Sequence, residues 1–289
     1  MLNIIRKLTK ILRGWPGGVL LCEPLRKAYG RKRKIARVDD FQGDLTMFLD
    51  LGEHMQSQIF WYGSYSRDLL PVVHRVLAPG MVFIDGGANI GEISVAAAKA
   101  VGSSGKVFAF EPVHRFAKHL RDHVAANRFQ NLEVSECGLS FEPGEAEIFI
   151  SDAPYRDGTH NDGLGSLFRR GDALGMTNTI PITTLDAFMA EKGVDRVDLL
   201  KLDIEGSELN ALKGGMEMLQ RHQPALIVEV GEDTCRAAGY SMNELVSFVQ
   251  GLGYSAYRIG RRGRLDPLER TGLAKFQNLF FTTRPVEPV

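Results

Sequence analysis

The stretch "FIDGGANIGEIS", residues 83–94, combines an acid with a glycine-rich turn. Asp85 ends an apolar run, Gly86 and Gly87 follow it, and Gly91 opens a segment with helical character. A glycine turn lets a ligand approach the backbone closely, because no Cβ atom intervenes. In open α/β sheets, ligands bind at the carboxyl ends of parallel strands. The stretch therefore predicts a binding turn for a nucleotide-like ligand.

Two acids restrict the identity of that ligand. Asp85 precedes the glycines, where a carboxylate would repel a pyrophosphate but would suit an ammonium group. The spacing GGxxxG also differs from the dinucleotide fingerprint GxGxxG. Glu111 ends the next apolar run, where an acid can accept hydrogen bonds from both ribose hydroxyls. A cationic amino-acid end plus a ribose describes S-adenosylmethionine better than NAD. The alternative is that Asp85 caps a helix and Glu111 is a surface acid.

The elements that must position these acids follow from about residue 81 onward. Short apolar segments rich in β-branched residues or phenylalanine alternate with helical segments, which predicts a parallel sheet with helices on both faces. The expected strands are 81–86, 106–112, 132–137, 197–203 and 224–230. The expected helices are 91–101, 114–127, 184–192 and 206–220. Segments 254–260 and 276–283 predict a hairpin-like pair at the sheet edge, and 139–180 is an insertion with one strand near 146–151.

A different pattern precedes residue 71, so we expect an amino-terminal extension over 1–70 and the main domain over 71–289. The extension contains a helix at 2–13, two strands at 34–41 and 44–51, and a helix at 52–63. That last helix leads into an aromatic stretch around Trp61.

Composition indicates a folded protein of the reducing cytoplasm. The chain has 289 residues, 44% hydrophobic and 24% charged, without an apolar run long enough for a transmembrane helix. Cys22, Cys137 and Cys235 lie far apart, so neither a disulfide framework nor a zinc site is expected. The net charge is zero, yet the segment before Val38 carries about +10.

The basic amino terminus favours an anionic partner. Within 2–13, isoleucines and leucines share one helical face and basic residues share the other, and "RKRK" at 31–34 adds a second cluster. This predicts peripheral contact with the inner face of a membrane. The alternative is that the helix packs on the domain, or on a second copy in a homo-oligomer. Nucleic acid is not expected as a partner, because the aromatic residues lie away from the basic cluster.

Five segments carry a resemblance to a known family. They are "FIDGGANIGEIS", "VFAFEP", "PITTLDAF", "VDLLKLDIEGSELNALKGG" and "PALIVEV". Over residues 60–230 the chain resembles the FkbM family of class I S-adenosylmethionine-dependent methyltransferases. The resemblance implies a Rossmann-like, seven-stranded, mostly parallel sheet with helices on both faces and an antiparallel last strand. It also implies O-methylation of hydroxyl groups, often on sugars or secondary metabolites.

The resemblance also assigns residues to parts of the cofactor. The methionine part would be held by Asp85, Gly87, Asn89 and Gly91. The ribose would be held by Glu111, and the adenine would lie beside Cys137 and Gly138.

Asp203 ends the fourth strand, next to the cofactor methyl group in this fold. It would act as general base or as a metal ligand. Glu229 ends the neighbouring strand, so the two acids could share a Mg²⁺ ion, or both could be structural. Glu205 is expected to cap the following helix, where an acid meets the helix dipole. Lys201 is expected to pair with a nearby acid.

Several residues are candidates for contact with the methyl acceptor. His160 could act as a base, or it could simply be solvated. Asn161 and Ser166 would touch substrate or cofactor. Trp61, Tyr62 and Tyr65 could stack on a sugar or cover the cofactor, or they could belong to a packed aromatic cluster. Two other functions stay open: a non-catalytic S-adenosylmethionine-binding protein and an NAD-dependent oxidoreductase.

Overall fold

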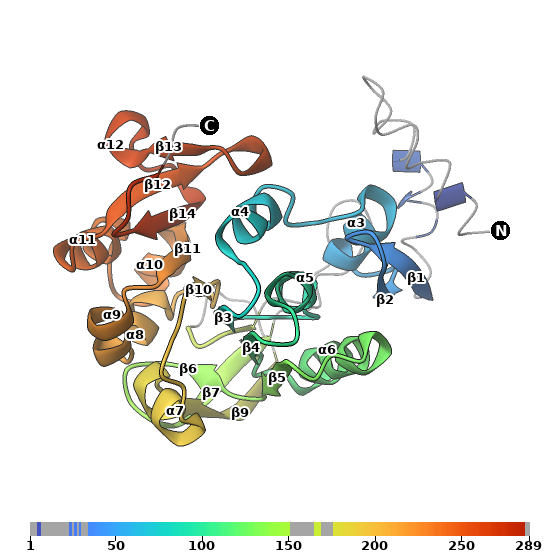
Figure 1. Cartoon of the computed structure of the whole chain (residues 1–289), viewed down its shortest axis with the longest axis horizontal. Helices are drawn as coiled ribbons and strands as arrows, with labels where there is room; N and C mark the ends of the chain where they lie inside the picture. The colour runs from blue at the N-terminus through green and yellow to red at the C-terminus, as the bar shows by residue number, and fades with distance from the viewer. Residues whose placement is uncertain are drawn as a thin grey trace.

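The main element of the fold is an eight-stranded sheet in the order β13-β12-β14-β11-β10-β3-β4-β5 (Figure 1). The computed structural model describes residues 34–150, 165–168 and 176–286, together with residues 5, 6, 23, 24, 26, 27 and 29. The strands are β3 (Val82–Gly86), β4 (Lys106–Phe110), β5 (Leu132–Ser135), β10 (Leu199–Leu202), β11 (Ala225–Gly231), β12 (Ser255–Ile259), β13 (Leu265–Pro267) and β14 (Phe276–Thr282).

The strand topology is the one that the resemblance implies. Strands β5, β4, β3, β10 and β11 run parallel, whereas β14 runs antiparallel to both its neighbours, β11 and β12. This confirms the predicted seven strands with an antiparallel last strand, and the short β13 adds an eighth. The expected terminal pair is present as the antiparallel strands β12 and β14, but it does not form the sheet edge. Strand β14 enters the sheet between β11 and β12, and β13 forms the edge.

Helices cover both faces of the sheet because the strand side chains alternate between two apolar clusters. Phe83 packs in the first cluster, whereas Ile84 packs in the second. The first cluster involves α4 (Leu69–Val76), α5 (Glu92–Val101) and α6 (His114–Asn127). The second involves α7 (Leu185–Lys192), α8 (Glu208–Lys213), α9 (Met216–His222) and α11 (Met242–Gly251). Three further short helices are α10 (Glu232–Ala237), η1 (Arg261–Gly263) and α12 (Leu268–Thr271).

One predicted helix, 206–220, is divided into α8 and α9. The break lies at Gly214, which packs so closely that an ideal Cβ would be 2.2 Å from the carbonyl oxygen of Ser140. The close approach holds the insertion against the main sheet. That insertion forms a four-stranded sheet in the order β6-β9-β7-β8. Its strands are β6 (Gly138–Leu139), β7 (Gly144–Ile150), β8 (Gly165–Ser166) and β9 (Met176–Thr183).

The predicted amino-terminal hairpin is present as β1 (Ile35–Phe41) and β2 (Leu45–Asp50), followed by α3 (His54–Tyr62). In Figure 1 these elements lie at the opposite end of the molecule from β12–β14. Their apolar side chains join the first cluster, and the buried His123 of α6 receives a hydrogen bond from the Phe48 amide of β2 at 2.9 Å. The hairpin is therefore fastened to the main sheet through α6. A division of the chain at residue 70 stays a prediction.

Two residues of the predicted amino-terminal helix are described, and both pack on the protein. Ile5 lies against the first cluster, and Arg6 is buried. The Arg6 guanidinium forms an ion pair with Asp40 and donates to the Phe60 carbonyl at 2.9 Å. This supports the packing alternative for that part of the segment. No helix in the described part of the chain combines the length and the apolar character needed to cross a bilayer.

Candidate active site

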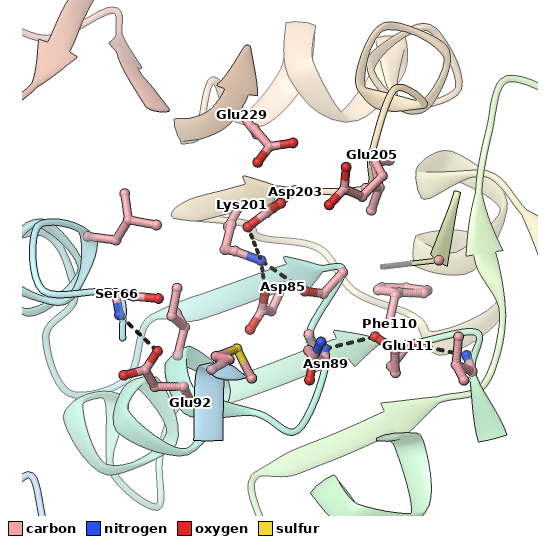
Figure 2. A pocket seen from close by; sticks show the side chains of 18 of the residues that line it. Ser66, Asp85, Asn89, Glu92, Phe110, Glu111, Lys201, Asp203, Glu205 and Glu229 are labelled. Atoms are coloured by element: carbon pink, nitrogen blue, oxygen red, sulfur yellow. Dashed lines mark hydrogen bonds and ion pairs between the residues drawn. The ribbon is translucent and has the colours of Figure 1, made fainter. Parts of the chain in front are cut away.

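A cavity of about 710 Å³ lies at the carboxyl ends of β3, β4, β10 and β11. Figure 2 shows its acids and Lys201 facing one another from these separate strands. The volume falls within the range usual for small-molecule sites. The parallel sheet explains why these acids meet, since each one lies at or just after the carboxyl end of its strand.

The floor of the cavity is a buried ion pair. Asp85 and Lys201 are directly opposite in the β3–β10 register, and the Lys201 Nζ lies 2.9 Å from Asp85 Oδ1. Ser94 donates to Asp85 Oδ2 at 2.6 Å. Burial lowers the pKa of Lys201, but the carboxylates of Asp85 and Asp203 outweigh it and hold that pKa above its ordinary value. The predicted ion pair of Lys201 is confirmed. Any ammonium group at Asp85 would share this carboxylate with Lys201.

The glycine turn is held against the end of β10. Gly87 has φ +76°, and an ideal Cβ there would lie 1.9 Å from the Asp203 carbonyl oxygen. No other residue fits this position without moving the backbone. Gly91, expected at the methionine part, does not line the cavity. Its ideal Cβ would lie 2.1 Å from Leu120 Cδ1, so glycine at 91 serves the packing of α5 on α6.

Glu111 is buried at the end of β4 and lines the cavity. Its Oε1 accepts from the Val113 amide at 2.9 Å, and its Oε2 accepts from the Asn89 amide at 2.8 Å. Asn89 also lines the cavity. Burial raises the pKa of Glu111 to about 7. Because a carboxylate oxygen carries two lone pairs, each oxygen can still accept one hydroxyl.

Beyond Glu111 the cavity wall becomes apolar. Cys137 and Gly138 both line it, as expected, together with Leu139, Ile148 and Ile180. Burial raises the pKa of the Cys137 thiol to about 11, which keeps it neutral. This wall suits an aromatic base better than a charged group.

Three carboxylates form a group beside Lys201. One oxygen from each of Asp203, Glu205 and Glu229 lies within 4.8 Å of the others. The Asp203 side chain is 34% exposed, whereas Glu229 is only 5% exposed. Burial raises the pKa of Glu229 well above its usual range, and the neighbouring carboxylates of Asp203 and Glu205 act in the same direction.

Glu205 does not cap the next helix as expected. It lies three residues before α8, in the left-handed conformation with φ +55°, and it lines the cavity. The carboxylate that binds the turn belongs to Glu208, which accepts from the amides of Ile204 at 2.9 Å and Gly206 at 3.0 Å. The sequence LDIEGSE offers both acids, and only the backbone path distinguishes them.

Of the two tyrosines proposed to meet the acceptor, only Tyr65 lines the cavity. Tyr62 points away, because it packs beside the fully buried Trp61 and its hydroxyl donates to Glu23. Burial raises the pKa of Tyr62. The packed-cluster alternative is thus correct for Tyr62 and Trp61. Tyr65 is 46% exposed at the cavity mouth.

Ser166 supports the site without lining the cavity. Its hydroxyl donates to the Glu205 carbonyl at 2.8 Å and accepts from the Phe168 amide at 3.1 Å. Ser166 therefore holds the Glu205 turn, and its direct contact with substrate or cofactor stays a prediction. His160 and Asn161 lie outside the described residues.

Glu92 was missed by the sequence reasoning, although it lies inside the quoted motif. Its buried carboxylate accepts from the amides of Tyr65 at 2.7 Å and Ser66 at 3.0 Å, and burial raises its pKa. It thereby ties the start of α5 to the cavity mouth (Figure 2). No local signal connects residues 26 positions apart, because the contact depends on how α3 and α4 return to the sheet.

Comparison with known proteins identifies the family. The model of the methyltransferase FkbM domain matches residues 85–256. The chain belongs to the FkbM methyltransferase family. It is an S-adenosylmethionine-dependent methyltransferase. The alternative of an NAD-dependent oxidoreductase does not agree with this family.

Two curated relatives of this FkbM methyltransferase were found. The 31-O-demethyl-FK506 methyltransferase FkbM of Streptomyces tacrolimicus is 28% identical over 218 residues, which are 68% of this chain and 81% of that protein. The AMB antimetabolite synthetase AmbE of Pseudomonas aeruginosa is 29% identical over 194 residues, 56% of this chain and 9% of that protein.

Solved structures to which the chain is similar include a methyltransferase FkbM from Methylobacillus flagellatus. It has 16% identity and a TM-score of 0.44, over 92% of this chain and 60% of that chain. An S-adenosylmethionine-dependent O-methyltransferase from Thermotoga maritima has 18% identity and a TM-score of 0.42, over 88% of this chain and 80% of that chain.

The residues of this FkbM methyltransferase fit the family's cofactor. Glu111 has lone pairs for two hydroxyls, and the apolar wall beside Cys137 suits an adenine. The acids and Lys201 leave the opposite side of the cavity polar, where a methyl acceptor would enter.

Proposed function

We propose that the protein transfers a methyl group to a hydroxyl oxygen of a sugar, a glycan or a secondary metabolite. The observation that carries this proposal is the position of Asp203. Its carboxylate opens into the cavity with a side chain 34% exposed, while its own carbonyl packs against the Gly87 turn. A base in contact with both the cofactor turn and the open cavity can meet an acceptor hydroxyl.

S-adenosylmethionine, when bound, supplies an electrophilic methyl carbon. The acceptor oxygen forms a bond to that carbon as the carbon–sulfur bond breaks, and the hydroxyl proton passes to a carboxylate oxygen of Asp203. A hydroxyl is weakly acidic, so the transfer needs such a base. A Mg²⁺ ion at Asp203 and Glu229 would serve the same step by lowering the pKa of the hydroxyl.

The named relative supports an oxygen acceptor. The Streptomyces tacrolimicus protein is called a 31-O-demethyl-FK506 methyltransferase, so its name places the methyl group on oxygen. We infer the same acceptor atom here, and the acidic cavity agrees with it, because carboxylates accept hydrogen bonds from hydroxyl-rich molecules.

The test is formation of S-adenosylhomocysteine with a panel of sugar, glycan and macrolide alcohols. Asp203→Asn keeps the side-chain shape but removes the base, so the rate should fall about 10²–10⁴-fold. Affinity for S-adenosylhomocysteine should stay within about threefold, since the interaction lost is one made in the transition state. The exposed Asp195→Asn serves as the matched control and should turn over normally.

Two results would contradict the proposal. Normal turnover by Asp203→Asn on a true acceptor would remove Asp203 from the chemistry. Cofactor binding by the wild-type protein without product from any alcohol would favour the non-catalytic binding protein.

A further inference from the structure

Glu205 enlarges the pair of acids at the ends of β10 and β11 to a group of three. One oxygen each of Asp203, Glu205 and Glu229 lies within 4.8 Å of the others, and Figure 2 shows the three side chains gathered on one side of the cavity. They come from a strand end, a left-handed turn and a neighbouring strand. Three carboxylates at this separation repel one another unless a cation or a proton lies between them.

Lys201 neutralises this group only in part, through a long ion pair with Asp203. An ammonium group has three hydrogens to donate. Lys201 directs them to Asp85 Oδ1 at 2.9 Å, the Gly86 carbonyl at 3.2 Å and the Gly87 carbonyl at 3.1 Å. Its distance to Asp203 is 3.9 Å. Lys201 is thus committed to the ion pair and the glycine turn beneath the group.

Glu229 provides an independent observation. Its side chain is buried at 5% exposure, and its Oε2 has no hydrogen-bond partner among the described residues. A buried polar atom without a partner is costly, so its usual explanation is an ion or water. Other buried acids of the cavity differ: both oxygens of Glu92 and of Glu111 accept backbone amides.

We propose that Asp203, Glu205 and Glu229 together bind one divalent cation of the Mg²⁺ or Mn²⁺ type. Hard cations of this kind prefer carboxylate oxygens, and the group contains neither histidine nor cysteine, the ligands that zinc favours. The exposed side of Asp203 leaves room for water or an acceptor to complete the coordination.

The role of the cation rests on the proposed methyl transfer. A cation held by these residues would lower the pKa of an acceptor hydroxyl. Asp203 would hold the cation through one oxygen and accept the hydroxyl proton at the other. The acceptor oxygen then bonds to the methyl carbon as the carbon–sulfur bond breaks. Ser166 holds the Glu205 carbonyl at 2.8 Å, which fixes the turn that presents the third carboxylate.

The site can be tested without activity, by titrating the metal-free full chain with Mn²⁺ and measuring free Mn²⁺ by electron paramagnetic resonance. We expect one Mn²⁺ per chain, displaced by Mg²⁺. Glu205→Gln and Glu229→Gln should each weaken binding at least about tenfold, because each loses an anionic ligand. Glu217→Gln, an exposed acid outside the cavity, is the matched control and should bind as the wild type does.

Folding of each variant is checked by its thermal unfolding, and the two Gln variants keep the shape of the native side chain. No Mn²⁺ binding by the wild type, or equal binding by wild type and Glu229→Gln, would overturn the site and leave a shared proton in its place. Methyl transfer that proceeds unchanged in a chelator would overturn the role of the cation while leaving the proposed function intact. Mn²⁺ binding that depends on Glu205 and Glu229, without methyl transfer to any alcohol, would support the site and contradict the proposed function.

Discussion

Individual buried acids in and around the cavity are held in place by backbone amides. Glu92, Glu111 and Glu208 each accept hydrogen bonds from two backbone amides of adjacent turns. Hydrogen bonds to a charged group are stronger than neutral ones. These carboxylates therefore fix the loops around the cavity, and Glu111 combines this structural role with the expected ribose contact.

Cofactor affinity should depend on pH through Glu111. Burial raises its pKa from 4.5 to about 7, so the ionised fraction grows as the pH rises from 6 to 8. The ionised carboxylate is the better acceptor for ribose hydroxyls. Affinity for S-adenosylhomocysteine should therefore increase with pH over this range, by up to about tenfold if only the ionised form binds. Calorimetric titration at several pH values measures the slope.

Glu111→Gln separates this effect from other titrations. The variant should lose the slope and bind roughly 1.5–3 kcal/mol more weakly, the scale of a hydrogen bond to a charged group. Glu145→Gln, on the exposed surface of β7, should behave as the wild type does. A slope that persists in Glu111→Gln would assign the pH dependence to another group.

At the scale of elements, glycine conformations determine how the helices meet the sheet. Gly91 is the N-cap of α5 and has φ +87°, with its ideal Cβ 2.1 Å from Leu120 Cδ1 of α6. Gly239 has a similar φ of +82°, but an ideal Cβ there meets nothing within 4 Å. The two positions share backbone strain and differ in packing.

Gly91→Ala should lower the free energy of unfolding more than Gly239→Ala does. The left-handed conformation costs about 1–2 kcal/mol for a residue with a Cβ. Overpacking against Leu120 should add about 1–3 kcal/mol at position 91 only. Urea unfolding of both variants measures the difference. Leu120→Ala should cost less in the Gly91→Ala background than alone, because it makes room for the added methyl group. Equal losses at positions 91 and 239 would contradict the packing role.

The strand-end residues could be predicted because parallel strands present their carboxyl ends at one edge. Asp85, Glu111 and Asp203 meet there for this reason. Side-chain alternation also places Asp85 and Lys201 on one face, which is why the ion pair was predictable.

Residues on turns and on distant elements could not be predicted in the same way. The backbone path of one turn gives Glu205 and Glu208 opposite roles. The contact of Glu92 with Ser66 depends on the tertiary position of the segment after α3. Tyr62 was placed in the site because aromatic residues suit sugars, but it ends α3 on the buried side. The pattern of a short helix does not show which of its aromatic residues reaches a cavity.

For the whole molecule, the basic segments 2–13 and 31–34 predict salt-sensitive contact with anionic lipid. Each basic residue near such a surface contributes about 1 kcal/mol. The protein should co-sediment with anionic vesicles at low salt and stay in the supernatant with neutral ones. Lys32→Glu with Arg33→Glu should weaken this binding at least about tenfold. Lys213→Glu with Arg221→Glu, an exposed pair elsewhere, is the control with the same change in charge.

Because Arg6 is buried, a lack of binding to anionic vesicles would be equally informative. Because Arg6 binds Asp40 and the Phe60 carbonyl, at least this residue of the predicted segment 2–13 contacts the rest of the protein. Equal recovery in the supernatant with both lipids would assign the apolar face of 2–13 to packing on the domain or on a second copy.

The insertion of β14 between β11 and β12 has a consequence for biosynthesis. Residues 276–282 are made after every other strand of the sheet, yet they pair with Leu226 and Ala256 through Phe281. Until they leave the ribosome, β11 and β12 expose unpaired edges, which readily pair with other chains. Domains fold as units during synthesis, amino-terminal parts first. Pairing of β11 and β12 with the rest of the sheet at this end is therefore complete only after β14 has been synthesised. A nascent chain stalled before residue 276 would depend on chaperones to protect those two edges.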